Sequence, residues 1–376
     1  MKGPLDGIRV LDLTSVVMGP YCTLQLADMG ADVIKVESAT GDTTRYLGPS
    51  RNKGMGSIFL HLNRNKRSVV LDLKSDEGKG KLLELVKTSD VFVHSMRPQS
   101  MERLGLTYRN LVEVNDKIIY CGMYGFSKEG PYGERPAYDD IIQGAAGVAA
   151  AQGQMTGSPQ YLSSLMADKT AGLIGVNAIV AALFSRERTG NGQEIEVPMF
   201  ETIISYNMIE HMYGETFTPA IGSSFYARAT SPFRKPYKTK DGHIGVLIYN
   251  DKQWEAFFGV SGHEELRNDT RFSDISERAA NIDFVYETVE RIMMERTTDE
   301  WLEIFETADI PCTRINNPED LFTDPHLRAT GFFKMVEHPT EGEIRTMKHP
   351  VNFSGTPVAI RSHAPRLGEH NTEILR

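Results

Sequence analysis

The first half of the chain alternates short hydrophobic runs with helical segments, and this alternation restricts the fold more than any other feature. The expected strands are 8–13, 33–37, 68–73, 91–93, 117–121 and 193–197, and the expected helices are 20–29, 76–87, 165–188 and 198–211. Strands that alternate with helices at spacings of about 25–35 residues are typical of βαβ units. The sequence therefore predicts an α/β fold with a mostly parallel sheet.

The second half of the chain has a different pattern, which predicts a separate and smaller domain. Residues 213–236 are rich in Thr, Ser, Pro, Gly and Arg, as in a linker. An expected strand at 243–248 and amphipathic helices at 283–295 and 298–308 follow, with Trp254 and Trp301 at apolar helical positions that predict core residues. Prolines then divide the rest of the chain into short strands and loops.

Charge and metal-ligand content exclude several classes of protein. The net charge of −9 argues against nucleic acid as a partner, and any anionic substrate needs a local basic site to bind. The chain has three cysteines, which lie far apart and form no CxxC pair. No disulfide framework and no metal site are therefore predicted, and the isolated histidines agree with this: His94, His211 and His243.

Neither a signal peptide nor a membrane span is expected. The first seven residues carry charge where a signal peptide has an apolar run. The longest apolar stretch, 173–184, is shorter than the roughly 20 residues that cross a bilayer, so it is expected to be a buried helix. A cytoplasmic location fits these features and the cysteine content best.

The first βα unit can be compared with a dinucleotide-binding motif. Glu37 ends the second expected strand, where an acid that binds ribose would lie. The phosphate loop does not fit, because one glycine, Gly19, stands where the fingerprint has three. Pro20 also removes an N–H that would face the pyrophosphate. Nicotinamide binding is therefore disfavoured.

Asp168 precedes a long apolar helix and has two interpretations. By position alone, an N-cap that bonds to the free N–H groups of the helix is favoured. A carboxylate at a helix N-terminus is also held ionised by the dipole, as a nucleophile must be. Gly172 and Gly175 follow one and two turns later, and they indicate either a bulky ligand on that face or close helix packing.

A series of short motifs, in a fixed order, resembles the class III CoA-transferases, the family of formyl-CoA and carnitine CoA-transferases. The resemblance covers nearly the whole chain, and the order and spacing of the motifs make it specific. The matching segments are 5–13 (LDGIRVLDL), 30–37 (GADVIKVE), 63–68 (NRNKRS), 125–126 and 130–131, 135–139 (RPAYD), 189–193 (TGNGQ), 310–312 (IPC) and 364–370 (APRLGEH).

This resemblance implies a fold and an assembly. A Rossmann-like large α/β domain would be built from both chain ends and joined to a small α+β domain. The expected divisions are 1–212 for the first part of the large domain, 213–236 for a linker, 237–325 for the small domain and 326–376 for the return to the large domain. Two chains would form an interlocked-ring homodimer.

The resemblance also implies the activity. CoA would pass from an acyl-CoA donor, with succinyl-CoA as a candidate, to a small carboxylic or dicarboxylic acid. Asp168 would be the nucleophile, forming aspartyl anhydride and aspartyl-CoA thioester intermediates. CoA is then a co-substrate, carried in as acyl-CoA, and no tightly bound cofactor is expected.

The CoA site carried over from the family covers fifteen positions. Among them, Lys74, Arg97 and Arg103 lie at or after the ends of strands, where open α/β sheets bind ligands and where cations would meet phosphates. The nearby run 64–67 is expected to be a short basic loop. The expected contacts are Val17, Met18, Ser38, Leu71, Asp72, Leu73, Lys74, Ser95, Met96, Arg97, Arg103, Pro136, Ala137, Tyr138 and Asp139.

The chain departs from the family at several positions. Ser38 stands where several members have Arg, and Ser95-Met96 stands where some have Asn-Phe. The glycine-rich loop that covers the active site of formyl-CoA transferases has no counterpart, because residues 210–270 contain no run of glycines. A specificity for oxalate and formate is therefore disfavoured.

Two other activities remain open alternatives. The α-methylacyl-CoA racemases share the fold and an Asp at this position, and they add a His where this chain has Tyr138. A phenol with a pKa of about 10 is a poor base near neutral pH, so Tyr138 favours transfer. A non-catalytic CoA-binding subunit is disfavoured because Asp168 is retained.

The acceptor-binding residues are not identified by any motif. The linker region carries Arg228, Arg234, Lys235 and Lys238, and their charge makes them candidates for binding a second carboxylate of an acceptor acid.

Overall fold

The computed structural model describes residues 3–376, and the chain divides into two compact units. The larger unit comprises Met1–Ala146, Ser163–Tyr206 and His326–Arg376, so it contains both ends of the chain. The smaller unit comprises Gly147–Leu162 and Asn207–Pro325. The larger unit resumes at His326, and Gly147–Leu162 clusters with the smaller unit.

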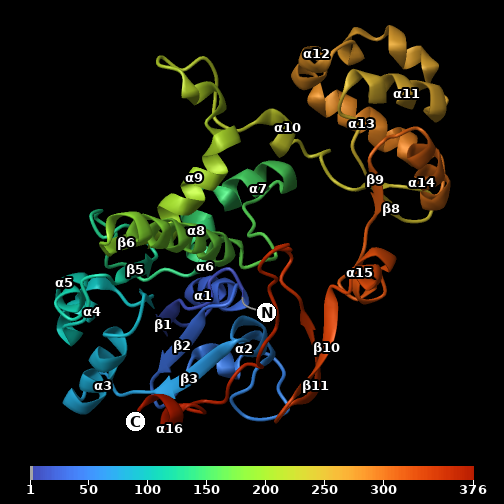
Figure 1. Ribbon diagram of the computed structural model, residues 1–376. Coiled ribbons are helices and arrows are strands. Elements are labelled where there is room, and N and C mark those ends of the chain that lie inside the picture. The colour runs from blue at the N-terminus through green and yellow to red at the C-terminus, as the bar shows by residue number, and fades with distance from the viewer. Residues whose placement is uncertain (1–2) are drawn as a thin grey trace. The chain divides into compact units, whose positions relative to one another are not determined.

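The larger unit is built on a six-stranded sheet in the order β3-β2-β1-β4-β5-β6, and every neighbouring pair is parallel. This order is that of a doubly wound α/β fold, which confirms the α/β prediction. Figure 1 shows β1, β2 and β3 side by side. The strands are β1 (Arg9–Leu13), β2 (Asp32–Glu37), β3 (Lys66–Val70), β4 (Val91–His94), β5 (Ile119–Tyr124) and β6 (Gln193–Pro198).

Helices cover this sheet and connect its strands. Among these helices, α1 makes its most extensive packing contact with α8, which is the longest of them. The helices of this part are α1 (Met18–Asp28), α2 (Ser57–Leu62), α3 (Asp76–Val86), α4 (Pro98–Leu104), α5 (Tyr108–Val112), α6 (Asp139–Ala145), α8 (Met166–Thr189) and α9 (Met199–His211).

The third strand lies earlier in the chain than expected. It was predicted at 68–73, but β3 begins at Lys66, and Arg64, Asn65 and Lys66 are all buried. Lys66 can be buried because its Nζ lies 3.0 Å from an Asp12 carboxylate oxygen and donates to the Thr23 hydroxyl. Arg64 and Asn65 therefore lie in a buried turn, as expected for a loop, whereas Lys66 and Arg67 belong to β3 and were wrongly predicted as loop.

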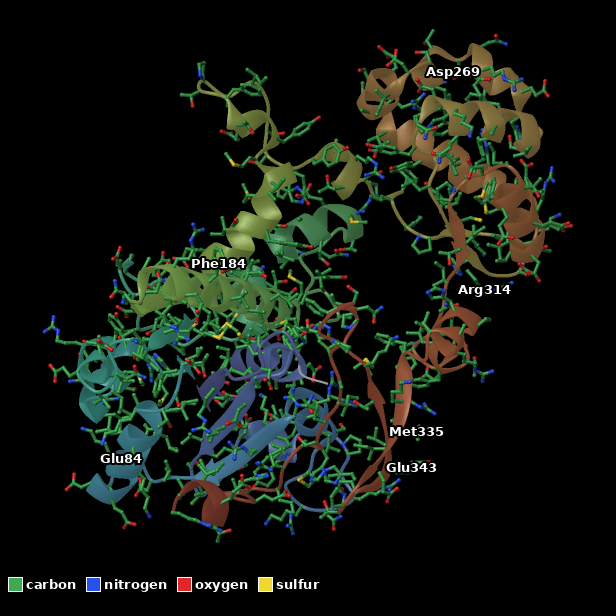
Figure 2. The ribbon with its side chains drawn as sticks, in the orientation of Figure 1. Glu84, Phe184, Asp269, Arg314, Met335 and Glu343 are labelled. Atoms are coloured by element: carbon green, nitrogen blue, oxygen red, sulfur yellow. The ribbon has the colours of Figure 1, made fainter. Side chains whose placement is uncertain are left out.

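The helix α8 is only partly buried, although its apolar stretch was expected to be a buried helix. One face packs inward, whereas Phe184 is 63% exposed on the other face together with Leu173, Ile174 and Val180. Figure 2 labels Phe184 on this helix. Within residues 3–376, α8 is the one helix with the length and hydropathy of a membrane span. Half of its most apolar window is buried, and partly buried helices of soluble proteins meet the same criterion.

The smaller unit combines helices with a three-stranded antiparallel sheet in the order β7-β8-β9. Its core contains Trp254 and Trp301, as predicted, together with Phe257 and Phe305. Its elements are α7 (Val148–Thr156), α10 (Ala227–Thr230), β7 (Tyr237–Lys238), β8 (His243–Val246), α11 (Asp251–Ser261), α12 (Ile275–Ala280), α13 (Ile282–Met293), α14 (Thr298–Thr307) and β9 (Cys312–Arg314).

The C-terminal segment returns to the edge of the parallel sheet. Its elements are α15 (Pro325–Ala329), the antiparallel pair β10 (Phe333–His338) and β11 (Gly342–Met347), and α16 (Asn371–Ile374). The His370 N–H donates to the Ser68 carbonyl at 3.0 Å, and Arg45 donates to the Pro365 carbonyl at 3.1 Å. The first bond attaches the last part of the chain to β3, beside which α16 lies in Figure 1, and the second attaches it to the turn after β2.

Candidate active site

A cavity of about 270 Å³ opens at the carboxyl edge of the parallel sheet. The strands β1 and β4 are neighbours there, and the chain leaves them toward opposite sides of the sheet order. Ligands of open α/β sheets bind at such a switch point. The lining residues are Ser15, Val16, Val17, Met18, Ser95, Arg97, Met123, Tyr124, Gly125, Gly133, Arg135, Pro136, Ala137, Tyr138, Asp168 and Met199.

Asp168 reaches this cavity from the first turn of α8. The helix begins at Met166 with Leu165 as its cap residue, so the N-cap interpretation of Asp168 is wrong. Its side chain lines the cavity although the residue is only 7% exposed. The Asp168 backbone N–H donates to the Asp139 carboxylate at 3.0 Å. That bond fixes the first turn of α8 against the start of α6.

Burial raises the pKa of Asp168 to about 7, the nearby Asp139 carboxylate adds to this rise, and Lys169 opposes it. The expectation that the helix N-terminus holds Asp168 ionised stays a prediction, and both burial and the second carboxylate work against it. Near neutral pH, protonated and ionised forms coexist. A carboxylate of this basicity is a stronger nucleophile than an ordinary one once it has lost its proton.

Asp139 holds the backbone of Asp168 in position. It is buried, and its two carboxylate oxygens accept from the Asp168 N–H and from Gln143 Nε2, the latter at 2.6 Å. Asp139 was predicted to contact CoA, but it is not among the residues that line the cavity. It lies behind Asp168 instead.

The loop between β1 and α1 forms one wall of the cavity, and buried charges hold its shape. Val16 adopts a φ of 69°, which is rare for a β-branched residue. Its N–H donates to an Asp42 carboxylate oxygen at 3.2 Å. Lys35 pairs with Asp42 at 2.9 Å and donates to the Thr14 carbonyl at 2.9 Å. The loop is therefore anchored at both residues by one buried ion pair.

The glycines of α8 serve helix packing. A Cβ on Gly172 would lie 2.8 Å from the Met18 carbonyl oxygen, and one on Gly175 would lie 2.8 Å from Met123 Cε. Both positions face protein atoms, so the close-packing interpretation is confirmed and the bulky-ligand one is wrong. The close approach brings α8, with Asp168, beside the loop that opens α1.

A second cavity of about 570 Å³ lies in the same unit and collects several of the other expected residues. Lys74 and Arg103 line it, and so does Lys79, which the sequence analysis did not identify. Three cations and one carboxylate, Asp76, face this space, and such a surplus attracts phosphates. The lining residues are Leu73, Lys74, Ser75, Asp76, Lys79, Met96, Ser100, Arg103 and Leu104.

The structure therefore distributes the fifteen expected CoA contacts over several environments. Seven line the Asp168 cavity, namely Val17, Met18, Ser95, Arg97, Pro136, Ala137 and Tyr138. Four line the second cavity, namely Leu73, Lys74, Met96 and Arg103.

The other four expected contacts line neither cavity. Besides Asp139, these are Leu71, which is a core residue, and Ser38, whose exposed hydroxyl is hydrogen-bonded to Thr40 at 2.9 Å. The Asp72 carboxylate accepts from the Lys74 N–H at 3.0 Å and shapes the loop that carries this lysine.

Several lining residues had been missed, although the strand pattern contains a signal for them. Ser15, Tyr124 and Met199 each lie at or just after the carboxyl end of a strand of the parallel sheet, namely β1, β5 and β6. Applied to every strand, the rule that places ligands at this edge would have found them. Arg135 is different, because it lies in an irregular loop and stacks on Tyr132 at 3.9 Å.

No histidine lies among the residues that line the Asp168 cavity. His94 ends β4 below it, is fully buried, and burial lowers its pKa to about 3. Across residues 3–376 there is no group of three His, Cys, Asp or Glu side chains placed to hold a metal ion.

The chain is similar over its full length to several CoA-transferases. The succinate–glutarate CoA-transferase of Agrobacterium fabrum is 32% identical over 387 residues, covering 100% of this chain and 95% of that protein. The human succinyl-CoA:glutarate CoA-transferase is 31% identical over 377 residues, covering 99% and 85%. A formyl-CoA:oxalate CoA-transferase of Rhodopseudomonas palustris BisA53 is 32% identical over 401 residues, covering 100% and 93%.

Two solved structures are also similar to the chain over its full length. A CAIB/BAIF family protein from Brucella suis has a TM-score of 0.84 and 31% identity, covering 100% of this chain and 99% of that one. A Mycobacterium tuberculosis protein in an orthorhombic crystal form has a TM-score of 0.86 and 28% identity, with the same coverage. The sequence model described as CoA-transferase family III matches residues 5–371. The chain therefore belongs to CoA-transferase family III and is a CoA-transferase.

Proposed function

We propose that this enzyme moves CoA from an acyl-CoA donor to a small carboxylic or dicarboxylic acid, with the Asp168 carboxylate as the nucleophile. The observation that carries the proposal is the place of Asp168, which is the only carboxylate among the described residues that line the switch-point cavity. Arg97 and Arg135 line the same cavity. Their charges favour the approach of an anionic acyl-CoA and of an acid.

The reaction proceeds by repeated acyl exchange at one side chain. The Asp168 carboxylate attacks the donor thioester, the C–S bond breaks, and an aspartyl–acyl anhydride and CoA thiolate form. The thiolate attacks the aspartyl carbonyl, which gives an aspartyl-CoA thioester and frees the donor acid. The acceptor carboxylate attacks this thioester, and the thiolate then takes the acceptor acyl group from the second anhydride. Asp168 is regenerated, and the steps need no tightly bound cofactor.

The partial burial of the site suits these intermediates. Anhydrides and thioesters are hydrolysed by water, so a nucleophile that is 7% exposed is protected while it is acylated. The raised pKa of Asp168, about 7, gives a carboxylate that reacts more readily with a thioester. The cost is that part of the enzyme carries a protonated Asp168 at neutral pH.

Replacement of the nucleophile tests the proposal. Asp168→Asn keeps the size of the side chain and can still lie in the cavity, but an amide is a poor nucleophile. We expect transfer from succinyl-CoA to fall below a few per cent of the unmodified rate, with an unchanged circular dichroism spectrum. Lys169→Gln, in the adjacent position, is the matched control and should keep most of the activity when both variants are assayed well above pH 7, where Asp168 is ionised in either case. A variant Asp168→Asn that retains substantial turnover would exclude Asp168 as the nucleophile.

The substrates are proposed on narrower grounds. Relatives named for glutarate and for oxalate are equally similar, at 32% identity each, so identity does not separate them. The absence of a glycine run in 210–270 disfavours oxalate and formate. We therefore propose succinyl-CoA as donor and a dicarboxylic acid larger than oxalate as acceptor. A panel of acids with succinyl-CoA and acetyl-CoA, followed by separation of the CoA esters, tests this.

Racemisation of the acyl-CoA is the alternative that shares the fold. It requires a base near neutral pH opposite Asp168, but no histidine is among the residues that line the cavity, and burial lowers the pKa of His94, at the end of β4, to about 3. If the enzyme has no racemase activity, acyl-CoA that is incubated with it in deuterated water should gain no deuterium at the α-carbon. A non-catalytic CoA-binding subunit would give neither reaction.

Assembly and location complete the proposal. An interlocked homodimer would cover the exposed apolar face of α8, where Leu173, Ile174, Val180 and Phe184 otherwise meet solvent. A cytoplasmic location fits the three free cysteines, Cys22, Cys121 and Cys312.

A further inference from the structure

The smaller unit contains a basic cavity that the family motifs do not cover. Its volume is about 400 Å³. Arg228 comes from α10, Tyr237 from β7 and Tyr286 from α13, so three separate elements converge on it. The remaining lining residues are Arg234, Lys235, Pro236, Gly245, Val246, Leu247, Ile248, Trp254 and Val289.

The charges of this cavity are not balanced. Lys235 pairs with Glu290 at 2.9 Å, so its charge is compensated. Arg228 and Arg234 have no carboxylate within ion-pair distance in the described part of the chain, residues 3–376. The cavity therefore carries about two uncompensated positive charges in a chain whose net charge is −9. A bound anion would stabilise two guanidinium groups that line one cavity, because it offsets the repulsion between them.

Both arginines act on the same phenol. The charges of Arg228 and Arg234 both lower the pKa of Tyr286, so both guanidinium groups act on this phenol. Burial nevertheless raises the pKa of Tyr286 above its ordinary value. Burial likewise raises that of Tyr237. The phenols therefore stay protonated, so they cannot neutralise the guanidinium groups but can donate hydrogen bonds to an anion.

The cavity also has an apolar part. Trp254 and Val289 line it and belong to the core of the unit. Two guanidinium groups beside a phenol and an apolar wall match a short alkyl chain with a carboxylate at each end. A phosphate would use the cations but not the apolar wall, and a separate cluster of Lys74, Lys79 and Arg103 is available for phosphates.

We propose that this cavity binds a small dicarboxylic acid, with Arg228, Arg234 and the Tyr286 hydroxyl as the anion-binding groups. The inference deepens the proposed function, because it rests on that function in identifying the ligand as the acceptor. Lys235 contributes less than either arginine, since it is already paired with Glu290.

Calorimetric titration of the full-length chain tests the site without acyl-CoA present. Glutarate and succinate should bind, and pentanoate, which lacks the second carboxylate, should bind about tenfold more weakly. Arg228→Gln and Arg234→Gln should each raise the glutarate dissociation constant by about tenfold or more, because each removes a charge-assisted contact. Tyr286→Phe should raise it by a smaller factor, because it removes one hydroxyl only.

The matched controls remove the same charge elsewhere in the unit. Arg291→Gln alters an exposed residue of the same helix α13 as Tyr286, outside the cavity, and should leave the affinity within about twofold. The glutarate dissociation constant of Lys235→Gln should lie between that of Arg291→Gln and those of Arg228→Gln and Arg234→Gln. Circular dichroism of each variant checks the fold, and Tyr286→Phe provides a mild variant should an arginine variant unfold. Equal glutarate affinity in Arg228→Gln, Arg234→Gln and Arg291→Gln overturns the proposal. The proposal is also overturned if inorganic phosphate or adenosine 3′,5′-bisphosphate binds with higher affinity than glutarate and displaces it.

A further variant separates this inference from the proposed transfer chemistry. Asp168→Asn should bind glutarate as the unmodified chain does, because Asp168 is not part of this cavity. Binding that persists while acyl-CoA fails to modify Asp168 contradicts the transfer mechanism only. Modification of Asp168 together with absent or arginine-independent glutarate binding contradicts the dicarboxylate site only.

Discussion

At the scale of the residue, Asp168 and Asp139 form an acidic pair in which one carboxylate faces the cavity and the other lies behind it. Asp139 accepts the Asp168 N–H, so it holds the first turn of α8 in place while its charge raises the pKa of its neighbour. The same residue therefore fixes the geometry and tunes the basicity of the nucleophile.

This pair predicts a pH dependence. Only the ionised form of Asp168 attacks, so kcat/KM for acyl-CoA should rise with pH through an apparent pKa near 7. Asp139→Asn removes the charge that raises this pKa but keeps an oxygen that can accept the Asp168 N–H, so the midpoint should move to lower pH. Lys169→Gln removes a charge that lowers it, so the midpoint should move to higher pH. Shifts of the opposite sign would contradict this account of the pair.

The sequence led to Asp168 as the proposed nucleophile, but it did not predict the environment of this side chain. Asp168 was found from its position before an apolar helix and from the surrounding family motifs. Its raised pKa depends on Asp139, which is 29 positions away in the chain and meets Asp168 only because α6 and α8 pack together. No local pattern carries that information.

At the scale of the element, the loop after β1 depends on charges buried beneath it. Lys35 of β2 and Asp42 are both almost fully buried, and together they bind the Thr14 carbonyl and the Val16 N–H. The strained Val16 backbone therefore persists because the surrounding ion pair overdetermines it.

Breaking this ion pair should be costly. Asp42→Asn leaves the Lys35 ammonium buried with less compensation, so the free energy of unfolding should fall by about 3 kcal/mol or more. Asp32→Asn is the control, because the Asp32 side chain is 35% exposed in its pair with Arg67 and should cost about 1 kcal/mol or less. Urea unfolding followed by circular dichroism measures both. Equal losses would show that the buried pair has no special weight.

Long periodic elements were predicted best. The α8 helix, the α3 helix and the strands β1, β2 and β4 lie within about two residues of their expected bounds, because their hydrophobic period is local. The start of β3 was missed because Lys66 is polar in sequence and becomes a core residue only through Asp12. The short helices α4 and α5 were not predicted, since few turns give little period to detect, and no bounds were predicted for α11, although Trp254 was expected at an apolar helical position.

At the scale of the whole molecule, each unit has its own core and its own cavity. The parallel sheet organises the Asp168 site, whereas the smaller unit carries the basic cavity around Arg228 and Tyr286. The proposed acyl exchange and the proposed recognition of a dicarboxylate are thus assigned to different compact units of one chain.

The exposed face of α8 predicts the assembly. Ile174 and Phe184 are 44% and 63% exposed, and burying them against a second chain would remove apolar surface from water. Ile174→Glu and Phe184→Glu should therefore lower the mass in solution from that of a dimer toward that of a monomer, as measured by light scattering during size exclusion. Ile275→Glu, an exposed apolar position in the smaller unit, is the control. An unmodified chain that is monomeric at every concentration would contradict the homodimer.

The covalent state of Asp168 tests the central claim most directly. The enzyme is incubated with succinyl-CoA, trapped with hydroxylamine, digested, and its peptides are mapped by mass spectrometry. The account predicts one hydroxamate, at Asp168, which is absent from Asp168→Asn and from enzyme not exposed to acyl-CoA. Sustained CoA transfer with no modified carboxylate, or with the hydroxamate at another residue such as Asp139, would contradict it.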